Sequence, residues 1–194
     1  LGVGSAFYIY GKNSIKKINF YDQLLLIILV YFFSSIFISL PYYFSNYQII
    51  FIDALFESFS GITSTGFSIF DNIKYLDPTL ILWRSTSQWI GGLYFIIFLT
   101  IIFTNNQYKF KLVHLVYSGN SGSYTSTNIK KVILQIFLIY SILTLFIFIL
   151  LNFGSIRLFN SLNLSMTIIS NGGFLPTNSL NQIFNNSNSF LLAI

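Results

Sequence analysis

Two short polar segments hold the residues of this sequence that are best suited to chemistry. Both combine hydroxyl or amide side chains with glycine, and each follows a short apolar stretch. The first polar segment is Thr63, Ser64, Thr65 and Gly66, and the second polar segment is Ser170, Asn171, Gly172 and Gly173. Glycine permits a positive φ and lets backbone carbonyls come close to an ion. Because rings of carbonyls can replace the hydration shell of a cation, the pattern points to binding of a partly dehydrated monovalent cation.

The two polar segments belong to an internal repeat. The stretch from Asp53 to Phe67 aligns with the stretch from Asn160 to Phe174 after a shift of 107 positions. The coincident pairs are Leu55/Leu162, Ser58/Ser165, Ile62/Ile169, Gly66/Gly173 and Phe67/Phe174. Similarity at a fixed spacing indicates a repeated structural unit. Here that unit is a long apolar span, a short helix, a glycine-containing turn and a second apolar run.

The composition places these units in a membrane. Of the 194 residues 54% are hydrophobic and only 8% are charged, whereas a soluble domain carries about 25% charged residues. Three apolar runs, 24–40, 80–103 and 132–151, are predicted to be transmembrane helices, since about 20 helical residues cross a bilayer core. Pro41 is expected to end the first of them. The fold class is therefore all-α integral membrane, with the lipid bilayer as the main surroundings.

The distribution of lysine and arginine predicts the orientation. Most of the basic residues lie before the first span and between the second and third spans, around Lys16 and Lys109, and few lie elsewhere. Cytoplasmic loops carry an excess of these residues, so those two connections are predicted to be cytoplasmic. The stretches 42–77 and 152–188 are then external. The net charge of +5 is attributed to this topology rather than to a nucleic-acid partner.

The stretches 51–62 and 157–168 are predicted to be short helices inside the two external connections. About three turns of helix cannot cross a bilayer, and non-helical backbone at membrane depth is tolerated only where it is buried in protein or lines a water-filled path. Two such stretches at matching places predict a pore or a binding site. The C-terminal ends of the helices would bring the negative pole of the helix dipole towards it, which favours a cation.

Four polar residues near the first polar segment are expected to support its structure. Two roles are open for Arg84: it either snorkels outward beside Trp83, or pairs with Gln88 or Glu57 and ties the second span to the first short helix. Asp53 either stabilises the first turn of that helix or attracts cations at the outer mouth. The role of Glu57 is left undecided. Asp77 followed by Pro78 is typical of a helix start.

Several classes of function find no support in the residues. There is no cysteine, and no phosphate-binding loop, nucleophile motif or metal-ligand spacing is found. His114 has no ligand partner in the sequence, so it is not expected to bind a metal. No catalytic residue, no cofactor and no nucleic-acid partner are predicted, and the protein is not expected to be an enzyme.

A longer motif carries a family resemblance. The run from Asp53 to Phe67 is followed by Trp83-Arg84-Ser85-Thr86-Ser87-Gln88-Trp89-Ile90-Gly91-Gly92. Together they resemble the Trk/Ktr/HKT potassium-transporter superfamily, and most closely the membrane (pore) subunit of bacterial Trk potassium uptake systems. The resemblance extends from about residue 12 to residue 194.

The resemblance implies four repeats of helix, pore helix, filter and helix arranged around one pore, of which this chain holds two. On that basis residues 1–17 are the end of a preceding helix and a cytoplasmic link, 18–104 the first pore-loop repeat, 105–129 a cytoplasmic loop and 130–194 a truncated second repeat. The chain is then the interior of a longer protein. The resemblance makes Gly66 and Gly173 the key glycines of two selectivity-filter segments.

The expected function is uptake of K⁺ across the bacterial cytoplasmic (inner) membrane by a multi-pass protein, with K⁺ bound only at the filter residues. The resemblance further implies a homodimer and a cytosolic nucleotide-binding regulatory subunit. The alternative is a non-conducting structural membrane subunit whose re-entrant loops bind no ion.

Overall fold

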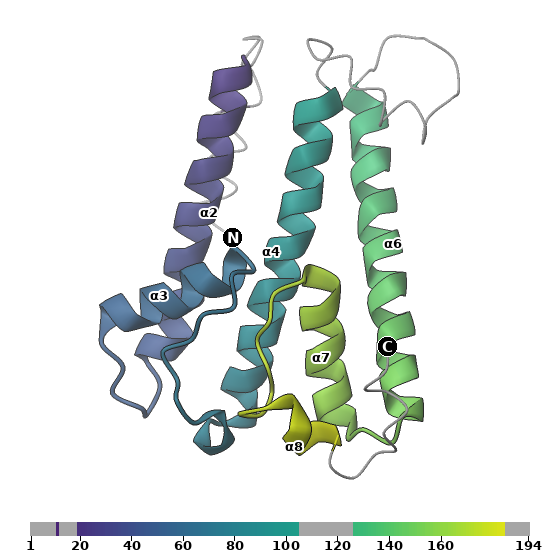
Figure 1. The fold of residues 1–194 in the computed structure, drawn as a ribbon. Helices are drawn as coiled ribbons and strands as arrows, with labels where there is room; N and C mark the ends of the chain where they lie inside the picture. Colours follow the sequence, from purple (N-terminus) through teal and green to yellow (C-terminus); the bar gives the residue numbers. More distant parts are fainter. Residues whose placement is uncertain (1–10, 12–18, 105–125, 185–194) are drawn as a thin grey trace.

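The computed structural model describes residues 11, 19–104 and 126–184, which form helices joined by loops (Figure 1). The long helices are α2 (Phe20–Tyr43), α4 (Pro78–Thr104) and α6 (Ser126–Phe153), and the short ones are α3 (Phe51–Ile62), η1 (Ile73–Tyr75), α7 (Leu158–Ser170) and α8 (Leu180–Phe184). The described residues contain no strand, and the all-α fold class is confirmed. The regions 1–10, 12–18, 105–125 and 185–194, which hold His114 and most of the predicted loop 105–129, lie outside the described residues.

The three predicted spans are confirmed as helices long and apolar enough to cross a membrane, over Phe20–Tyr43, Pro78–Ile102 and Lys131–Phe153. The helices extend beyond the predicted runs at both ends. The predicted end of the first span at Pro41 was wrong, because α2 continues through Pro41 to Tyr43. Proline lacks a backbone N–H and clashes with the preceding turn. Because Pro41 lies in the last turn of α2, the helix ends two residues later instead of at the proline itself.

The helix starts follow local sequence rules. Asn19 and Asp22 form a capping box at the start of α2, in which the Asn19 N–H donates to the Asp22 carboxylate at 3.1 Å. Asp77 precedes α4, and its carbonyl accepts the N–H groups of Leu80 and Ile81 at 2.9 and 3.1 Å. Pro78 is the first helical residue, a position where the missing N–H costs nothing.

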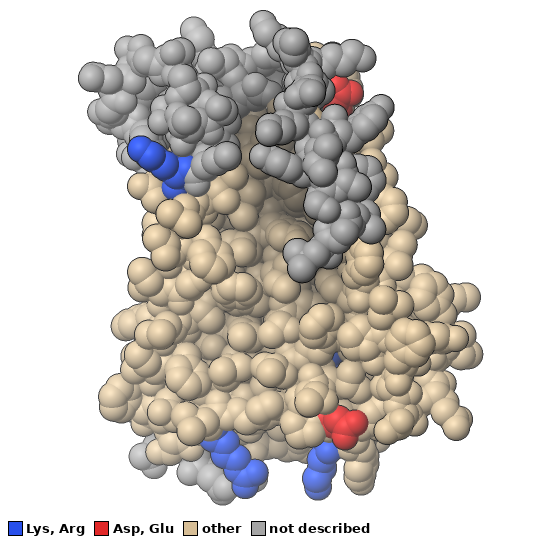
Figure 2. All heavy atoms as spheres, turned by 180° about the vertical axis from the view of Figure 1, so that it is seen from behind, with Lys and Arg blue, Asp and Glu red and all other residues tan. Residues whose placement is uncertain are grey.

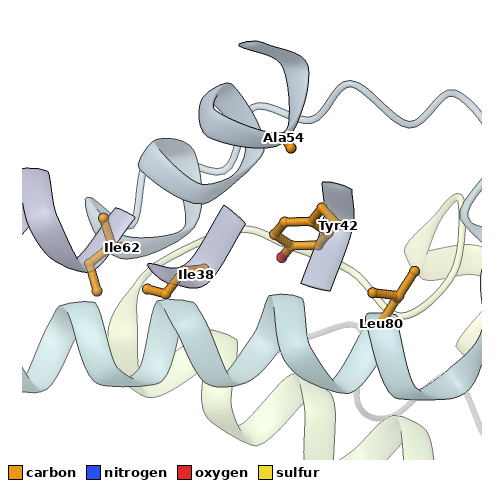
Figure 3. Packing of buried hydrophobic residues seen from close by; sticks show 5 residues of the cluster. All are labelled: Ile38, Tyr42, Ala54, Ile62 and Leu80. Atoms are coloured by element: carbon orange, nitrogen blue, oxygen red, sulfur yellow. The ribbon is translucent and has the colours of Figure 1, made fainter. Parts of the chain in front are cut away.

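The core lies where the short helices meet the long ones. A cluster of buried apolar side chains joins α2, α3 and α4 (Figure 3), and its members are Ile38, Tyr42, Ala54, Ile62 and Leu80. Helix α3 packs against α2 and α4, and α7 packs against α4 and α6. Helix α4 therefore contacts both short helices and connects the two repeats.

The outward faces of the long helices suit a lipid environment. Large apolar side chains such as Phe37 on α2 and Leu145 on α6 are exposed. On the face seen in Figure 2, most charged side chains lie near the two ends, with an uncharged band between them. An exposed apolar band with polar ends fits a bilayer, where apolar side chains cost nothing to expose.

Candidate ion-conducting site

The two short helices enter the bundle and the chain then returns to the end from which they came. In Figure 1 α7 starts near the lower end of α6 and rises partway between α4 and α6, while α3 slants across the lower half of α2 towards α4, and a descending loop follows each of them. They have 12 and 13 residues, about 18 and 20 Å at 1.5 Å per residue. Neither is long enough to cross a bilayer core of about 30 Å.

Both short helices end in the same hydrogen-bonded turn. Ser64 donates its N–H to the carbonyl of Gly61 at 2.9 Å, and Thr65 donates to Ser60 at 2.9 Å. In the second repeat Asn171 donates to Ile168 at 3.0 Å, and Gly172 to Thr167 at 2.9 Å. This pair of bonds is the Schellman motif, which needs a left-handed residue after the helix. Ser64 and Asn171 supply it, each with a φ of 54°.

Gly66 and Gly173, which were predicted to be the key glycines, have backbone conformations that favour glycine. Gly66 has a φ of 84° and Gly173 a φ of 79°, in the region that side chains disfavour. The two polar segments also touch here, because a Cβ placed on Gly66 would strike the carbonyl oxygen of Gly172. The structure thus brings together the two segments that the repeat identified 107 positions apart.

Two adjacent glycines in α4 let the ends of both short helices lie directly against that helix. A Cβ on Gly91 would strike the carbonyl of Ile62, the last residue of α3. A Cβ on Gly92 would lie 2.9 Å from the Cα of Ser170, the last residue of α7. Small residues allow such close approach between membrane helices. The glycine pair therefore fixes where both polar segments begin.

A cavity of about 410 Å³ lies between the ends of the short helices. Its walls include both polar segments and the glycine pair, through Thr63, Ser64, Ser170, Asn171, Gly91 and Gly92, together with Tyr31, Phe95, Ile96 and Ile169. The C-termini of α3 and α7 both border this cavity, and the negative ends of helix dipoles favour a cation there. Of the eight residues predicted to line the ion path, Thr63, Ser64, Ser170 and Asn171 border it.

A buried ion pair lies behind the first polar segment. The Arg84 Nε donates to the Glu57 carboxylate at 2.7 Å, and the two side chains are 1% and 0% exposed. Glu57 also accepts the Ser68 hydroxyl at 3.1 Å and the Ile69 backbone N–H at 2.9 Å. The carboxylate therefore connects α3 and α4 to the loop that follows Gly66.

Arg84 reaches the second repeat as well. Its guanidinium lies 4.3 Å from the centre of the Phe174 ring and donates to the carbonyl of Leu175 at 3.5 Å. It also donates to the Ser68 hydroxyl at 3.0 Å. The outward, snorkelling arrangement considered for Arg84 is therefore wrong, because its charge is buried between the repeats and paired with Glu57.

Gln88 supports the second polar segment. Its Nε2 donates to the carbonyl of Gly172 at 2.5 Å, and its Oε1 accepts the N–H of Phe174 at 3.1 Å. The contact between Arg84 and Gln88 considered from their spacing is not the one found, because both of these Gln88 bonds cross to the other repeat. A Cβ on Gly172 would strike the Gln88 side chain, so glycine there makes room for the amide.

Asp53 lies apart from these groups. It is exposed in the first turn of α3, whose N-cap residue is Ile50. The Asn178 side chain joins the loops of the two repeats, accepting the N–H of Ile73 at 2.7 Å and donating to Asn72 at 3.0 Å.

Sequence reasoning missed Ser68, Phe174 and Asn178 as supporting residues. Phe174 had a signal, since it coincides with Phe67 in the repeat, but the alignment cannot show that the two rings are placed differently. Ser68 and Asn178 had none, because their partners come from other parts of the chain.

The comparisons with known proteins define the class of protein to which this fold belongs. A family model described as a cation transport protein, TrkH, matches residues 12–194. The chain belongs to this family of transporters, and the family is not one of enzymes. It is a multi-pass protein of the bacterial inner membrane, with the three apolar helices described above as spans.

Two relatives illustrate the likeness. An uncharacterized cation transporter of Methanocaldococcus jannaschii is 26% identical over 167 residues, which cover 84% of this chain and 34% of the relative. The Trk system potassium uptake protein TrkH of Salmonella typhimurium is 25% identical over 177 residues, covering 90% of this chain and 37% of the relative. The chain thus spans about a third of the length of these curated relatives.

A solved structure shares the fold. The crystal structure of the potassium transporter TrkH from Vibrio parahaemolyticus superposes with a TM-score of 0.68 at 23% identity, over 86% of this chain and 32% of that one. At this identity the likeness concerns the fold, and the roles of individual residues must be argued from their own geometry.

Proposed function

We propose that the intact protein carries K⁺ into the cytoplasm through a selectivity filter to which this chain contributes two of four segments. The observation that carries the proposal is the pairing of Gly66 and Gly173, which lie in contact at the ends of two short helices and share one unusual backbone conformation. Its chemistry is the replacement of water around K⁺ by oxygens of Thr63–Gly66 and Ser170–Gly173. The printed names of several relatives, which describe potassium uptake, support K⁺ as the ion.

The electrostatics of the site agree with this function. Helices α3 and α7 direct their C-terminal ends at the same cavity, so two partial negative charges face it. The neighbouring carboxylate, Glu57, is neutralised by Arg84 and turned away into the wall. The cation would therefore be bound mainly by backbone oxygens and dipoles, which suits an ion that must bind and leave quickly.

The assembly is part of the proposal. We expect the complete protein to act as a homodimer in a Trk-type system, with a cytosolic nucleotide-binding regulatory subunit on the side of residues 105–129. The relatives named as Trk system proteins support this setting.

The test is Gly66→Ser in the intact protein, measured as uptake of K⁺ and of Na⁺ by cells that lack other uptake systems. A side chain at Gly66 meets both a strained φ and the Gly172 carbonyl, so the ratio of K⁺ to Na⁺ uptake should fall. Gly11→Ser is the matched control, because a Cβ at Gly11 meets nothing within 4 Å.

The ratio separates loss of selectivity from loss of folding. A variant that only misfolds would lower K⁺ and Na⁺ uptake together. If Gly66→Ser leaves both rates unchanged, Gly66 is not in a filter, and the alternative of a non-conducting structural subunit gains support.

A further inference from the structure

Among residues 131–153 of helix α6, Tyr140 is the only buried residue, with 3% of its surface exposed. Helix α6 runs beside α4 and packs against it (Figure 1), but only 6% of the residues in its most apolar stretch are buried. Lipid chains are as apolar as the side chains of such a helix, so apolar burial does little to hold it in place. The position of α6 must therefore depend on specific contacts around Tyr140.

A closed network of hydrogen bonds at Tyr140 joins α6 to α4. The Tyr140 hydroxyl donates to the Trp89 carbonyl of α4 at 3.1 Å. The Trp89 indole N–H donates to the Thr144 hydroxyl at 2.9 Å, and that hydroxyl donates to the Tyr140 carbonyl at 2.7 Å. The centres of the Trp89 and Tyr140 rings lie 5.3 Å apart. Because polar bonds between membrane helices help to hold them together, this network fixes α6 on α4 at one level.

The Tyr140 hydroxyl lies where α4 meets the start of the second polar segment. A Cβ on Gly92 would lie 2.6 Å from this hydroxyl oxygen and 2.9 Å from the Cα of Ser170. The hydroxyl, Gly92 and the last residue of α7 therefore share one junction. Gly92 and Ser170 also border the cavity between the short helices, so the junction forms part of the wall of the candidate ion path.

The contact of Ser170 with α4 at this junction is one of packing. The Ser170 hydroxyl donates to the carbonyls of Met166 and Thr167 at 2.9 and 3.1 Å, so its hydrogen bonds stay within α7. A glycine such as Gly92 allows another helix to approach closely, but it offers no side chain to hold that helix. The start of the second polar segment therefore depends on the groups that surround the junction.

The internal repeat does not account for a tyrosine at this place. The equivalent residue, 107 positions earlier, is Phe33, which is 54% exposed on α2. A phenylalanine at position 140 would bury the same ring without a polar group. Since a buried hydroxyl is costly unless it is hydrogen-bonded, the bond from Tyr140 to Trp89 is the feature that distinguishes this site from its counterpart.

We infer that Tyr140 is a positioning residue for the second polar segment, on which it acts through Gly92 and Ser170 without touching the ion. This role rests on the proposed function and adds a residue of α6 to the support of the filter. Gln88 holds the later part of the segment by its bond to the Gly172 carbonyl, and Tyr140 holds the start. Without the hydroxyl the junction loosens, and a filter whose oxygens are held less firmly discriminates less between cations.

The first measurement compares Tyr140→Phe with Tyr43→Phe in the intact protein. Both changes remove one hydroxyl from a ring, but Tyr43 is 47% exposed in the last turn of α2. Tyr140→Phe should lower the ratio of K⁺ to Na⁺ uptake about threefold, the size expected from one neutral hydrogen bond, while Tyr43→Phe leaves the ratio unchanged. Thr144→Val, which removes the acceptor of the Trp89 indole, should shift the ratio in the same direction and serves as the second variant if Tyr140→Phe lowers the folded yield. Ratios equal to that of Tyr43→Phe would overturn the proposal.

The second measurement needs no ion flow and tests where the hydroxyl lies. Gly92→Ala introduces a Cβ that meets both the Tyr140 hydroxyl and Ser170, so it should lower the melting temperature of the detergent-solubilised protein. Because part of this loss comes from the hydroxyl, Gly92→Ala should lower the melting temperature less in a Tyr140→Phe background than in the parent protein. Equal losses in the two backgrounds would show that Tyr140 does not act at this junction.

Gly66→Ser, measured in the same cells, separates this role of Tyr140 from the proposed function. A ratio of K⁺ to Na⁺ uptake that changes in Gly66→Ser but not in Tyr140→Phe would overturn the role of Tyr140 alone. If neither variant changes the ratio, the proposed function fails, and the positioning role fails with it.

Discussion

The two repeats share a backbone but are held in place by different chemistry. In the first repeat Arg84 and Glu57 form a buried ion pair, and both also bind the hydroxyl of Ser68. The positions equivalent to Glu57 and Ser68 in the second repeat, 107 residues on, are Leu164 and Leu175. Leu164 packs instead in an apolar cluster with Ile156 and Ile183. The first repeat is supported by its own charged pair. The second repeat is supported by apolar packing and by contacts with Arg84 and Gln88 of the first repeat.

This difference shows that the turn after the short helix does not require one particular support. Both turns have the same two hydrogen bonds and a left-handed residue at the equivalent position, Ser64 or Asn171, whether a carboxylate or a leucine lies behind them. Arg84 has a second role, which it shares with Gln88: both side chains of α4 form hydrogen bonds with the second repeat. We interpret these contacts of Arg84 and Gln88 as the means by which α4 aligns the two polar segments.

The largest effect is expected from Arg84→Leu. It leaves the fully buried Glu57 carboxylate unpaired, and breaking such a pair costs about 3–5 kcal/mol. The variant should lose much of its folded yield and its melting temperature, measured by size-exclusion chromatography of heated, detergent-solubilised protein.

The double variant Glu57→Leu/Arg84→Leu makes the first repeat resemble the second and removes both charges. It should recover most of the lost stability, because apolar replacements of buried pairs are often tolerated. The recovery should be incomplete, since the contacts of Arg84 with Phe174 and Leu175 stay absent. A double variant less stable than Arg84→Leu would mean that the unpaired charge is not the cause.

A smaller and more local effect is expected from Gln88→Leu. The change leaves the Gly172 carbonyl and the Phe174 N–H without their partner, at a cost of about 1–3 kcal/mol. Because these groups belong to the second polar segment, the ratio of K⁺ to Na⁺ uptake should fall while the protein still folds. Thr86→Val, two residues away on the same helix, is the control. Equal ratios in the two variants would remove Gln88 from the support of the filter.

The sequence was sufficient to predict the three long helices and the two short ones at the polar segments, but not η1 or α8. The second short helix was placed at 157–168 and runs from Leu158 to Ser170. Helix α3 begins and ends where the pattern placed it, at Phe51 and Ile62, because length, hydropathy and the following Gly66 are local signals. The start of α4 at Pro78 was predicted from an equally local signal, Asp77 followed by Pro78. Pro41 misled the prediction of the α2 end, since a proline in the last turn still leaves room for two more helical residues.

The partners of the polar side chains could not be predicted in the same way. Arg84 and Gln88 lie one turn apart on α4, yet Arg84 binds Glu57 and Gln88 binds the second polar segment. Which group each one meets depends on how closely α3 and α7 approach α4, and that approach is set by Gly91 and Gly92. Spacing along one helix identifies the residues on a face but not what the fold brings to that face.

The smallest effect is expected at the start of the short helices, where Asp53 in α3 is matched by Asn160 in α7. Both lie in the first turn, where an acidic side chain interacts favourably with the helix dipole, by about 0.3–1 kcal/mol at low ionic strength and less when screened by salt. Asp53→Asn should therefore lower the melting temperature slightly, only at low salt, and leave the KM for K⁺ unchanged. The reciprocal Asn160→Asp should raise the melting temperature by a similar amount. A higher KM for K⁺ in Asp53→Asn at low salt would instead mean that this exposed carboxylate attracts cations to the mouth, and the first repeat would then differ from the second in ion entry as well as in support.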